Sequence, residues 1–276
     1  MNPIEEYNIT DTIKIGPNQP LVVLAGPCVL EEQSICDEIA GTMKEACDSL
    51  GISYVFKASF DKANRTSVES FRGPGIDAGI EQFKLIKKNH GVPIVTDIHE
   101  SWQPAKLAGV VDIMQIPAFL CRQTSLLIAA AETGAAINVK KGQFLAPGDM
   151  KSVLEKLRST GNRKISLCER GTTFGYNNLV VDMRGIQIMR ELGAPVIFDA
   201  THSVQIPGGQ GNKSGGQPQF IAPLARAAAS VGIDGLFLET HPEPCKALSD
   251  GANSLKLSDV KNVLEKVVAI RDIVNS

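Results

Sequence analysis

Four residues whose side chains commonly ligate metal ions end or follow short apolar runs of the chain. Cys28, His202 and Glu239 each stand near the end of such a run, and Asp250 lies in the segment after Glu239. A thiolate, an imidazole and two carboxylates form a mixed ligand set that suits a divalent transition ion such as Zn²⁺, Fe²⁺ or Mn²⁺. Because a buried cysteine is often only a small core residue, the set predicts a metal site only if the fold brings these residues together.

Positively charged side chains form a second group with chemical potential. Lys57, Lys62, Arg65, Lys140 and Arg170 lie on or just beyond strand-like runs. Burying several unpaired cations together costs several kcal/mol for each ion, so anions must compensate them. The arginine fork binds phosphate or carboxylate and lysine adds a compact charge, which favours a small phosphorylated acid as ligand. Two alternatives stay open: solvated charges at the rim, and a Schiff-base lysine at Lys57 or Lys140 with a depressed pKa.

Eight short apolar or β-branched runs alternate with longer segments of helical periodicity. Such alternation is typical of repeated βα units, and eight units without a break in composition favour a closed barrel over an open sheet. The runs cover residues 21–28, 54–59, 93–99, 111–118, 136–141, 164–170, 195–202 and 235–241. The sequence therefore predicts an α/β fold, a (β/α)8 TIM barrel, with residues 1–276 as a single domain. Within it, residues 1–19 form an N-terminal extension whose segment IKIGPNQP predicts a small hairpin over the barrel floor.

Polar residues recur on the predicted inner faces of the strands, near their carboxyl ends. Alternate residues of a barrel strand face the interior, and barrel enzymes place their active sites at this end. The inner sets are expected to be Lys57 with Ser59, Asp97 with His99, Asn138 with Lys140, Ser166 with Cys168 and Arg170, and Phe237 with Glu239 and His241. In the seventh run we expect Phe198, Ala200 and His202 to share the inner face. Lys141 should point away from the site as an ordinary solvated charge.

The charge balance and the hydropathy of the chain argue against several classes of function. The 28 Lys and Arg residues against 30 Asp and Glu residues leave a formal charge of -2, which provides no broad basic field for nucleic acid. Residues 1–30 match neither a signal peptide nor a membrane span of about 20 apolar residues. Six cysteines without a C-x-x-C pair are typical of reduced thiols. We therefore expect a cytoplasmic enzyme of small molecules, with no nucleic acid or membrane partner.

The glycine-rich segment 207–219, PGGQGNKSGGQPQ, has too few apolar residues to pack. It predicts a mobile loop after the seventh strand, in a position to close over the site. Its GNKS portion does not match the G-x-x-x-x-G-K-[ST] phosphate loop, so ATP is not implied.

Seven segments resemble the 3-deoxy-D-manno-octulosonate 8-phosphate synthase (Kdo8P synthase) family, and together they span almost the whole predicted barrel. They are AGPCVLE at 25–31, FKASFDKANRTS at 56–67, DIMQIPAFLCRQT at 112–124, NVKKGQF at 138–144, ERGTTFGYNNLVVDMR at 169–184, FDATHSVQ at 198–205 and LETHPEPCKALSDGANSL at 238–255. The related DAHP synthases typically carry K-P-R-T where this chain has Lys62-Ala63-Asn64-Arg65. The resemblance is therefore to the enzymes that make the eight-carbon product.

The resemblance implies condensation of phosphoenolpyruvate with D-arabinose 5-phosphate and water, which gives Kdo8P and inorganic phosphate for lipopolysaccharide synthesis. It implies that Lys140 and Arg170 hold the phosphate of phosphoenolpyruvate, that Lys57, Ser59, Lys62 and Gln115 surround its carboxylate end, and that Asn64 and Arg65 reach the sugar phosphate. Since the family forms homotetramers, Arg122 of a neighbouring subunit is implied to complete the sugar phosphate site. Asp97 and His202 are candidates for the proton relay, and Lys57 and Lys62 are further candidate catalytic residues.

The resemblance also implies a class of cofactor. Metal-independent members of the family carry asparagine at the position of Cys28, so Cys28 with His202, Glu239 and Asp250 implies the metal-dependent class. Three rival functions stay open: a DAHP synthase that acts on erythrose 4-phosphate, a Schiff-base aldolase, and a phosphosugar-binding barrel without catalysis.

Overall fold

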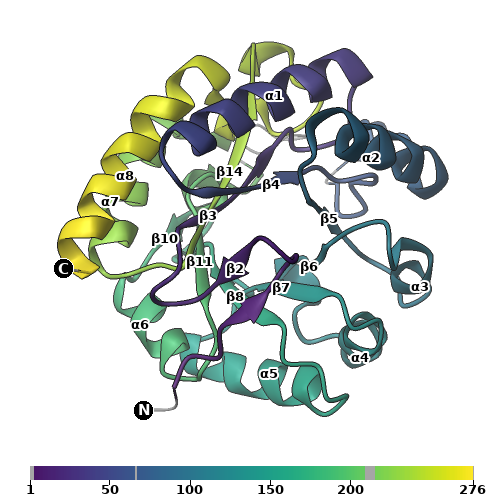
Figure 1. Ribbon diagram of the computed structural model, residues 1–276. Helices are drawn as coiled ribbons and strands as arrows, with labels where there is room; N and C mark the ends of the chain where they lie inside the picture. The colour runs from purple at the N-terminus through teal and green to yellow at the C-terminus, as the bar shows by residue number, and fades with distance from the viewer. Residues whose placement is uncertain (1–2, 66, 209–214, 276) are drawn as a thin grey trace.

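The computed structural model describes residues 3–65, 67–208 and 215–275, and within them eight parallel strands close into a barrel (Figure 1). In order around the barrel these strands are β3 (Val22–Gly26), β4 (Ser53–Lys57), β5 (Ile94–Asp97), β6 (Ile113–Ile116), β7 (Ala136–Lys140), β8 (Ile165–Glu169), β11 (Val196–Asp199) and β14 (Gly235–His241). The sheet closes because β14 pairs with β11 on one side and with β3 on the other. The predicted TIM barrel is confirmed.

Helices surround the strands in the outer ring of Figure 1. They are α1 (Gln33–Ser49), α2 (Ile76–His90), α3 (Gln103–Leu107), α4 (Thr124–Glu132), α5 (Met150–Arg158), α6 (Arg184–Arg190), α7 (Ile221–Ser230) and α8 (Val260–Asn275). In α2 the buried residues Gly79, Phe83 and Ile86 recur at helical spacing, which gives the helix one face for the barrel. Gly91 ends α2 in the left-handed conformation, with φ of 64°, and its N–H donates to the carbonyl of Lys87.

The N-terminal extension forms the expected hairpin, with β1 (Tyr7–Asn8) antiparallel to β2 (Lys14–Ile15). Tyr7 and Ile15 are buried and pack in one cluster with residues of the barrel interior, among them Val22. The hairpin therefore covers the floor of the barrel. The segment IKIGPNQP supplies only the second strand, because Lys14 and Ile15 pair with Asn8 and Tyr7, which precede the segment.

The predicted inner face of the seventh strand is wrong by one residue. Phe198 and Ala200 of the β11 region pack in the outer core between strands and helices, whereas Ile197 packs inside the barrel. Asp199 is therefore the inward residue at the end of β11. His202 lies beyond the strand, in the 3-10 turn His202–Val204, so a strand period cannot be extended to it.

Short elements complete the mouth of the barrel. Two antiparallel pairs, β9 (Thr172–Thr173) with β10 (Leu179–Val180) and β12 (Gln205–Ile206) with β13 (Gly215–Gly216), follow β8 and β11, and β15 (Leu255–Lys256) pairs with β14. The 3-10 turns are Ala118–Leu120, Pro147–Asp149, His202–Val204, Pro218–Phe220, Pro244–Lys246, Gly251–Asn253 and Leu257–Asp259. The centre of the predicted mobile loop, residues 209–214, lies outside the described residues. Among the described helices, none is long and apolar enough to cross a membrane.

Candidate active site

A cavity of about 1100 Å³ lies where the barrel strands end. Most of the predicted site residues line it: Lys57, Lys62, Asn64, Arg65, Asp97, Gln115, Lys140, Arg170, His202 and Asp250. Cys28, Ser59 and Glu239 are buried and hydrogen-bond to Asp250, Asp97 and Lys57 of that lining, respectively. Arg122 is exposed and is not among the described residues that line the cavity. One chain thus gathers the predicted site except for Arg122.

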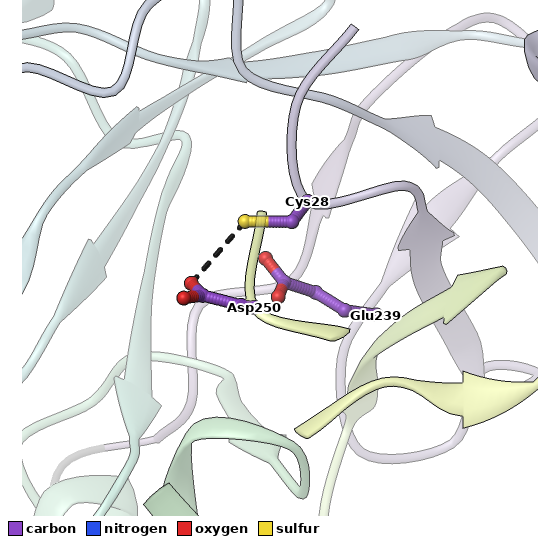
Figure 2. Close-up of side chains that lie close together, drawn as sticks. All are labelled: Cys28, Glu239 and Asp250. Atoms are coloured by element: carbon purple, nitrogen blue, oxygen red, sulfur yellow. Dashed lines mark hydrogen bonds between the residues drawn. The ribbon is translucent and has the colours of Figure 1, made fainter. Parts of the chain in front are cut away.

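Three of the four predicted metal ligands converge, as Figure 2 shows. The sulfur of Cys28 and one carboxylate oxygen each of Glu239 and Asp250 all lie within 4.8 Å of one another. His202 stands beside this group, with Nε2 at 3.6 Å from Oε1 of Glu239 and 4.0 Å from Oδ2 of Asp250. The pairing of β14 with β3 brings Glu239 next to Gly26, which positions the first and last barrel strands for this convergence.

Two features of the ligand atoms fit a bound cation. Oε2 of Glu239 is buried without a hydrogen-bond partner among the described residues, which is costly unless a ligand uses the oxygen. Burial, and then the charges of Asp250 and Glu239, raise the pKa of the Cys28 thiol above its usual range, and Sγ donates to Oδ2 of Asp250 at 3.2 Å. A divalent ion would stabilise the thiolate and replace that proton. The donor set therefore suits a divalent metal.

The side chain of Lys57 is buried and contacts two of the candidate metal ligands. Its Nζ donates to Oε1 of Glu239 at 2.9 Å and to the carbonyl of Cys28 at 3.2 Å. Burial alone would lower the pKa of Lys57, but the nearby anions, with Glu239 first and Asp97 after it, together outweigh burial, so the net shift is upward. A Schiff-base lysine requires a depressed pKa, so the alternative prediction of such a lysine is wrong for Lys57.

Lys140 and Arg170 present further positive charge to the cavity. Nζ of Lys140 donates to Oδ2 of Asp199 at 2.7 Å and lies 3.8 Å from the centre of the Phe237 ring. Nη2 of Arg170 donates to Oε1 of Gln205 at 3.1 Å, whereas its Nη1 is buried without a partner among the described residues. An anion in the cavity would satisfy that donor.

Asp199 is a site residue that the sequence reasoning missed. Its Oδ2 accepts hydrogen bonds from Lys140 and from Nδ1 of His202, at 2.7 and 2.8 Å, and its Oδ1 accepts from the backbone N–H of His202. Burial opposes its ionisation, but the charges of His202 and Lys140 hold the pKa of Asp199 well below its usual value. By engaging Nδ1, Asp199 turns Nε2 of His202 toward Glu239 and Asp250. A correct strand phase, with Ile197 inside, would have identified it.

Asp97 accepts hydrogen bonds from two polar side chains of the site. Ser59 Oγ and Gln115 Nε2 both donate to its carboxylate. Burial alone would raise the pKa of Asp97, but Lys57, Lys62 and Lys140 together lower it far below its usual value. The carboxylate is thus ionised and acts as an acceptor.

Lys141 points away from the cavity as expected, but the expectation that it is solvated is wrong. Its side chain is fully buried, and Nζ donates to Thr172 Oγ1 at 2.9 Å and lies 3.6 Å from Oε1 of Glu169. The same oxygen of Glu169 accepts the backbone N–H groups of Arg170 and Gly171. The buried pair connects the ends of β7 and β8, directly behind Lys140 and Arg170.

The closed parallel barrel with a polar, cation-lined mouth defines a (β/α)8-barrel enzyme. The family described as the DAHP synthetase I family matches residues 3–276, and the chain belongs to that family. The chain is 55% identical to the 2-dehydro-3-deoxyphosphooctonate aldolase of Fusobacterium nucleatum subsp. nucleatum over an alignment of 274 residues. This alignment covers 99% of this chain and 98% of the relative. Proteins with the same name from a Cyanothece species and from Syntrophotalea carbinolica are each 56% identical, with 96% of this chain and 97% of the relative covered.

Proposed function

We propose that this chain is a Kdo8P synthase, which condenses phosphoenolpyruvate with D-arabinose 5-phosphate and water to give Kdo8P and inorganic phosphate. The observation that carries the proposal is the convergence of Lys57, Lys62, Lys140 and Arg170 on one cavity, in which a guanidinium nitrogen of Arg170 has no partner among the described residues. Relatives at about 55% identity bear the name of the aldolase that corresponds to this reaction. Substrates that carry two phosphates and a carboxylate would compensate these cations.

We assign the substrate roles that the family resemblance implies, and the lining of the cavity supports them. Lys140 and Arg170 hold the phosphate of phosphoenolpyruvate, and Lys57, Ser59, Lys62 and Gln115 surround its carboxylate. Asn64 and Arg65 also line the cavity, with Nη1 of Arg65 at 3.5 Å from Oδ1 of Asp250, and take the sugar phosphate. Arg122 completes that phosphate site from a neighbouring subunit of a homotetramer, a role supported by its exposure outside the cavity of its own chain.

In this reaction C3 of phosphoenolpyruvate attacks the aldehyde carbon, water adds at C2, and phosphate leaves by C–O cleavage. The lysines stabilise the negative charge of the bound phosphate and carboxylate groups, and the ionised Asp97 balances the positive charge that develops at C2. The low pKa of Asp97 makes it a weak base in the free protein, where it holds Ser59 and Gln115. We therefore assign the proton relay mainly to His202, in the state in which Nε2 does not ligate the metal, because Asp199 engages Nδ1.

We further propose that Cys28, His202, Glu239 and Asp250 hold a divalent metal, with Zn²⁺, Fe²⁺ and Mn²⁺ as the ions that suit the ligands. A bound metal would supply Lewis acidity near the aldehyde or the attacking water. Two observations support this site: the buried Oε2 of Glu239 has no hydrogen-bond partner among the described residues, and ligand atoms of Cys28, Glu239 and Asp250 lie within 4.8 Å of one another.

The test is release of inorganic phosphate from phosphoenolpyruvate plus arabinose 5-phosphate, measured before and after chelation and after addition of Zn²⁺ or Mn²⁺. We expect release that chelation abolishes and metal restores. Release that survives exhaustive chelation would contradict the metal proposal alone. A parallel assay with erythrose 4-phosphate tests the DAHP synthase alternative. This alternative needs a test because the matching family is described as the DAHP synthetase I family. A preference for that four-carbon substrate would reverse the assignment.

A further inference from the structure

A line of buried hydrogen bonds crosses the barrel interior and reaches the cavity at Asp97 and Gln115. Ser166 Oγ donates to Oδ1 of Asn138 at 3.3 Å, and Nδ2 of Asn138 donates to Oε1 of Gln115 at 3.1 Å. Nε2 of Gln115 then donates to Oδ1 of Asp97, whose other oxygen accepts from Ser59. The line thus runs across β8, β7, β6 and β5, and its members are almost completely inaccessible to solvent.

The charge of Asp97 gives this line a direction. An ionised carboxylate only accepts hydrogen bonds, so the amide nitrogen of Gln115 must face Asp97 and its carbonyl oxygen must face Asn138. Asn138 can satisfy that oxygen only with its own amide nitrogen, which leaves its Oδ1 for the hydroxyl of Ser166. Each side-chain amide therefore has one favourable orientation.

This direction decides what Gln115 offers to a ligand. Its carbonyl oxygen is engaged by Asn138 and one N–H by Asp97, and the side chain lines the cavity whereas Asn138 does not. The remaining group is the second N–H, a hydrogen-bond donor that suits an anion. If the amide were turned over, it would place an oxygen beside Asp97 and toward the anionic end of the substrate, and both contacts would be repulsive.

We propose that Asn138 is a positioning residue that holds the amide of Gln115 with an N–H, and not its oxygen, toward the carboxylate end of phosphoenolpyruvate. The inference rests on the proposed function for the identity of the anion. It adds to that function a buried residue that does not touch substrate and acts only through Gln115.

The experiment compares Asn138→Asp and Asn138→Leu with the unchanged enzyme in the phosphate release assay. Both substitutions are close in size to asparagine, and both remove the donor to Gln115. We expect KM for phosphoenolpyruvate to rise about tenfold, from the loss of one hydrogen bond to a charged group, while KM for arabinose 5-phosphate changes less than about twofold. Circular dichroism establishes that each variant folds. Binding of phosphoenolpyruvate alone, measured by calorimetry, should weaken in parallel and does not depend on turnover.

Two comparisons separate positioning from a structural role. Ser166→Ala leaves the bond between Asn138 and Gln115 in place, so KM for phosphoenolpyruvate should change less than about threefold. In a Gln115→Ala background, Asn138→Leu should have little further effect on phosphoenolpyruvate binding, because the residue acts through Gln115. Additive effects in the double variant, or an equal rise in both KM values, would overturn the proposal. Failure of the unchanged enzyme to turn over would instead count against the proposed function, and the calorimetry would still test Asn138.

Discussion

Replacement of Asp199 by asparagine tests whether the charge between Lys140 and His202 organises the site. Asp199 accepts hydrogen bonds from Lys140 and His202 with one oxygen, at 2.7 and 2.8 Å, and is fully buried. Removing one member of a buried ion pair costs about 3 to 5 kcal/mol, because the other charge stays buried without compensation. An asparagine oxygen can still accept one of these bonds, so we expect Asp199→Asn to lose about 3 kcal/mol of unfolding free energy.

The second expected effect is on metal affinity. Loss of the hydrogen-bond partner that orients a ligating histidine typically weakens metal binding about 10- to 100-fold. We therefore expect Zn²⁺ to bind the Asp199→Asn variant more weakly by about that factor. Urea unfolding measures the stability, and competition with a chelating dye measures the affinity. Asp182→Asn is the matched control, because Asp182 pairs with Arg184 at the exposed surface, where such a pair contributes less than about 1 kcal/mol.

The pH dependence gives a further check on Asp199. Its folded-state pKa is lowered, so its contribution to stability is complete above the unfolded-state pKa of about 3.9 and declines as the pH falls toward the folded-state value. The stability difference between Asp199→Asn and the unchanged protein should be constant near neutral pH and shrink below about pH 4. If Asp199→Asn and Asp182→Asn proved equally stable, or if metal affinity did not change, the reasoning would be refuted.

Three other substitutions address separate parts of the site. Cys28→Ala should abolish high-affinity Zn²⁺ binding while the barrel stays folded, as read by calorimetry and circular dichroism; unchanged Zn²⁺ affinity would remove Cys28 from the ligand set. Arg170→Lys should raise KM for phosphoenolpyruvate about tenfold or more, because lysine lacks the planar fork; an equal KM would mean that the fork does not contact phosphate. Lys141→Met should lower the unfolding free energy by about 3 kcal/mol by leaving Glu169 buried without its partner, and restored stability in Lys141→Met with Glu169→Gln would identify the pair as the cause.

Much of the fold follows from the sequence because the alternation of buried strands and amphipathic helices is a local signal. The eight apolar runs coincide with the eight barrel strands, and the convergence of Cys28, Glu239 and Asp250 follows once the first and last strands are neighbours. Even the side of Lys141 was predictable, since adjacent strand residues face opposite ways.

The parts that could not be predicted depend on where strands stop and on tertiary neighbours. The two-residue period that places His202 inside the barrel places Asp199 outside it, but this period ends before His202, where the chain turns into a 3-10 helix. The burial of Lys141 depends on Glu169 and Thr172 from the next βα unit, and the sequence around Lys141 does not indicate these two partners. Side-chain partners across neighbouring strands are set by register, which periodicity alone does not give.

The pairing of β14 with β3 has a consequence for the biosynthesis of the protein. Cys28 emerges from the ribosome early, whereas Glu239 and Asp250 are among the last barrel residues to be translated. Domains fold during synthesis at about 5–20 residues per second, so a nascent chain spends most of its translation with the first strand lacking its final neighbour. A ribosome that stalls before β14 therefore carries an open sheet and only one of the three converging ligands. Acquisition of a metal at this site would be a step that follows completion of the chain.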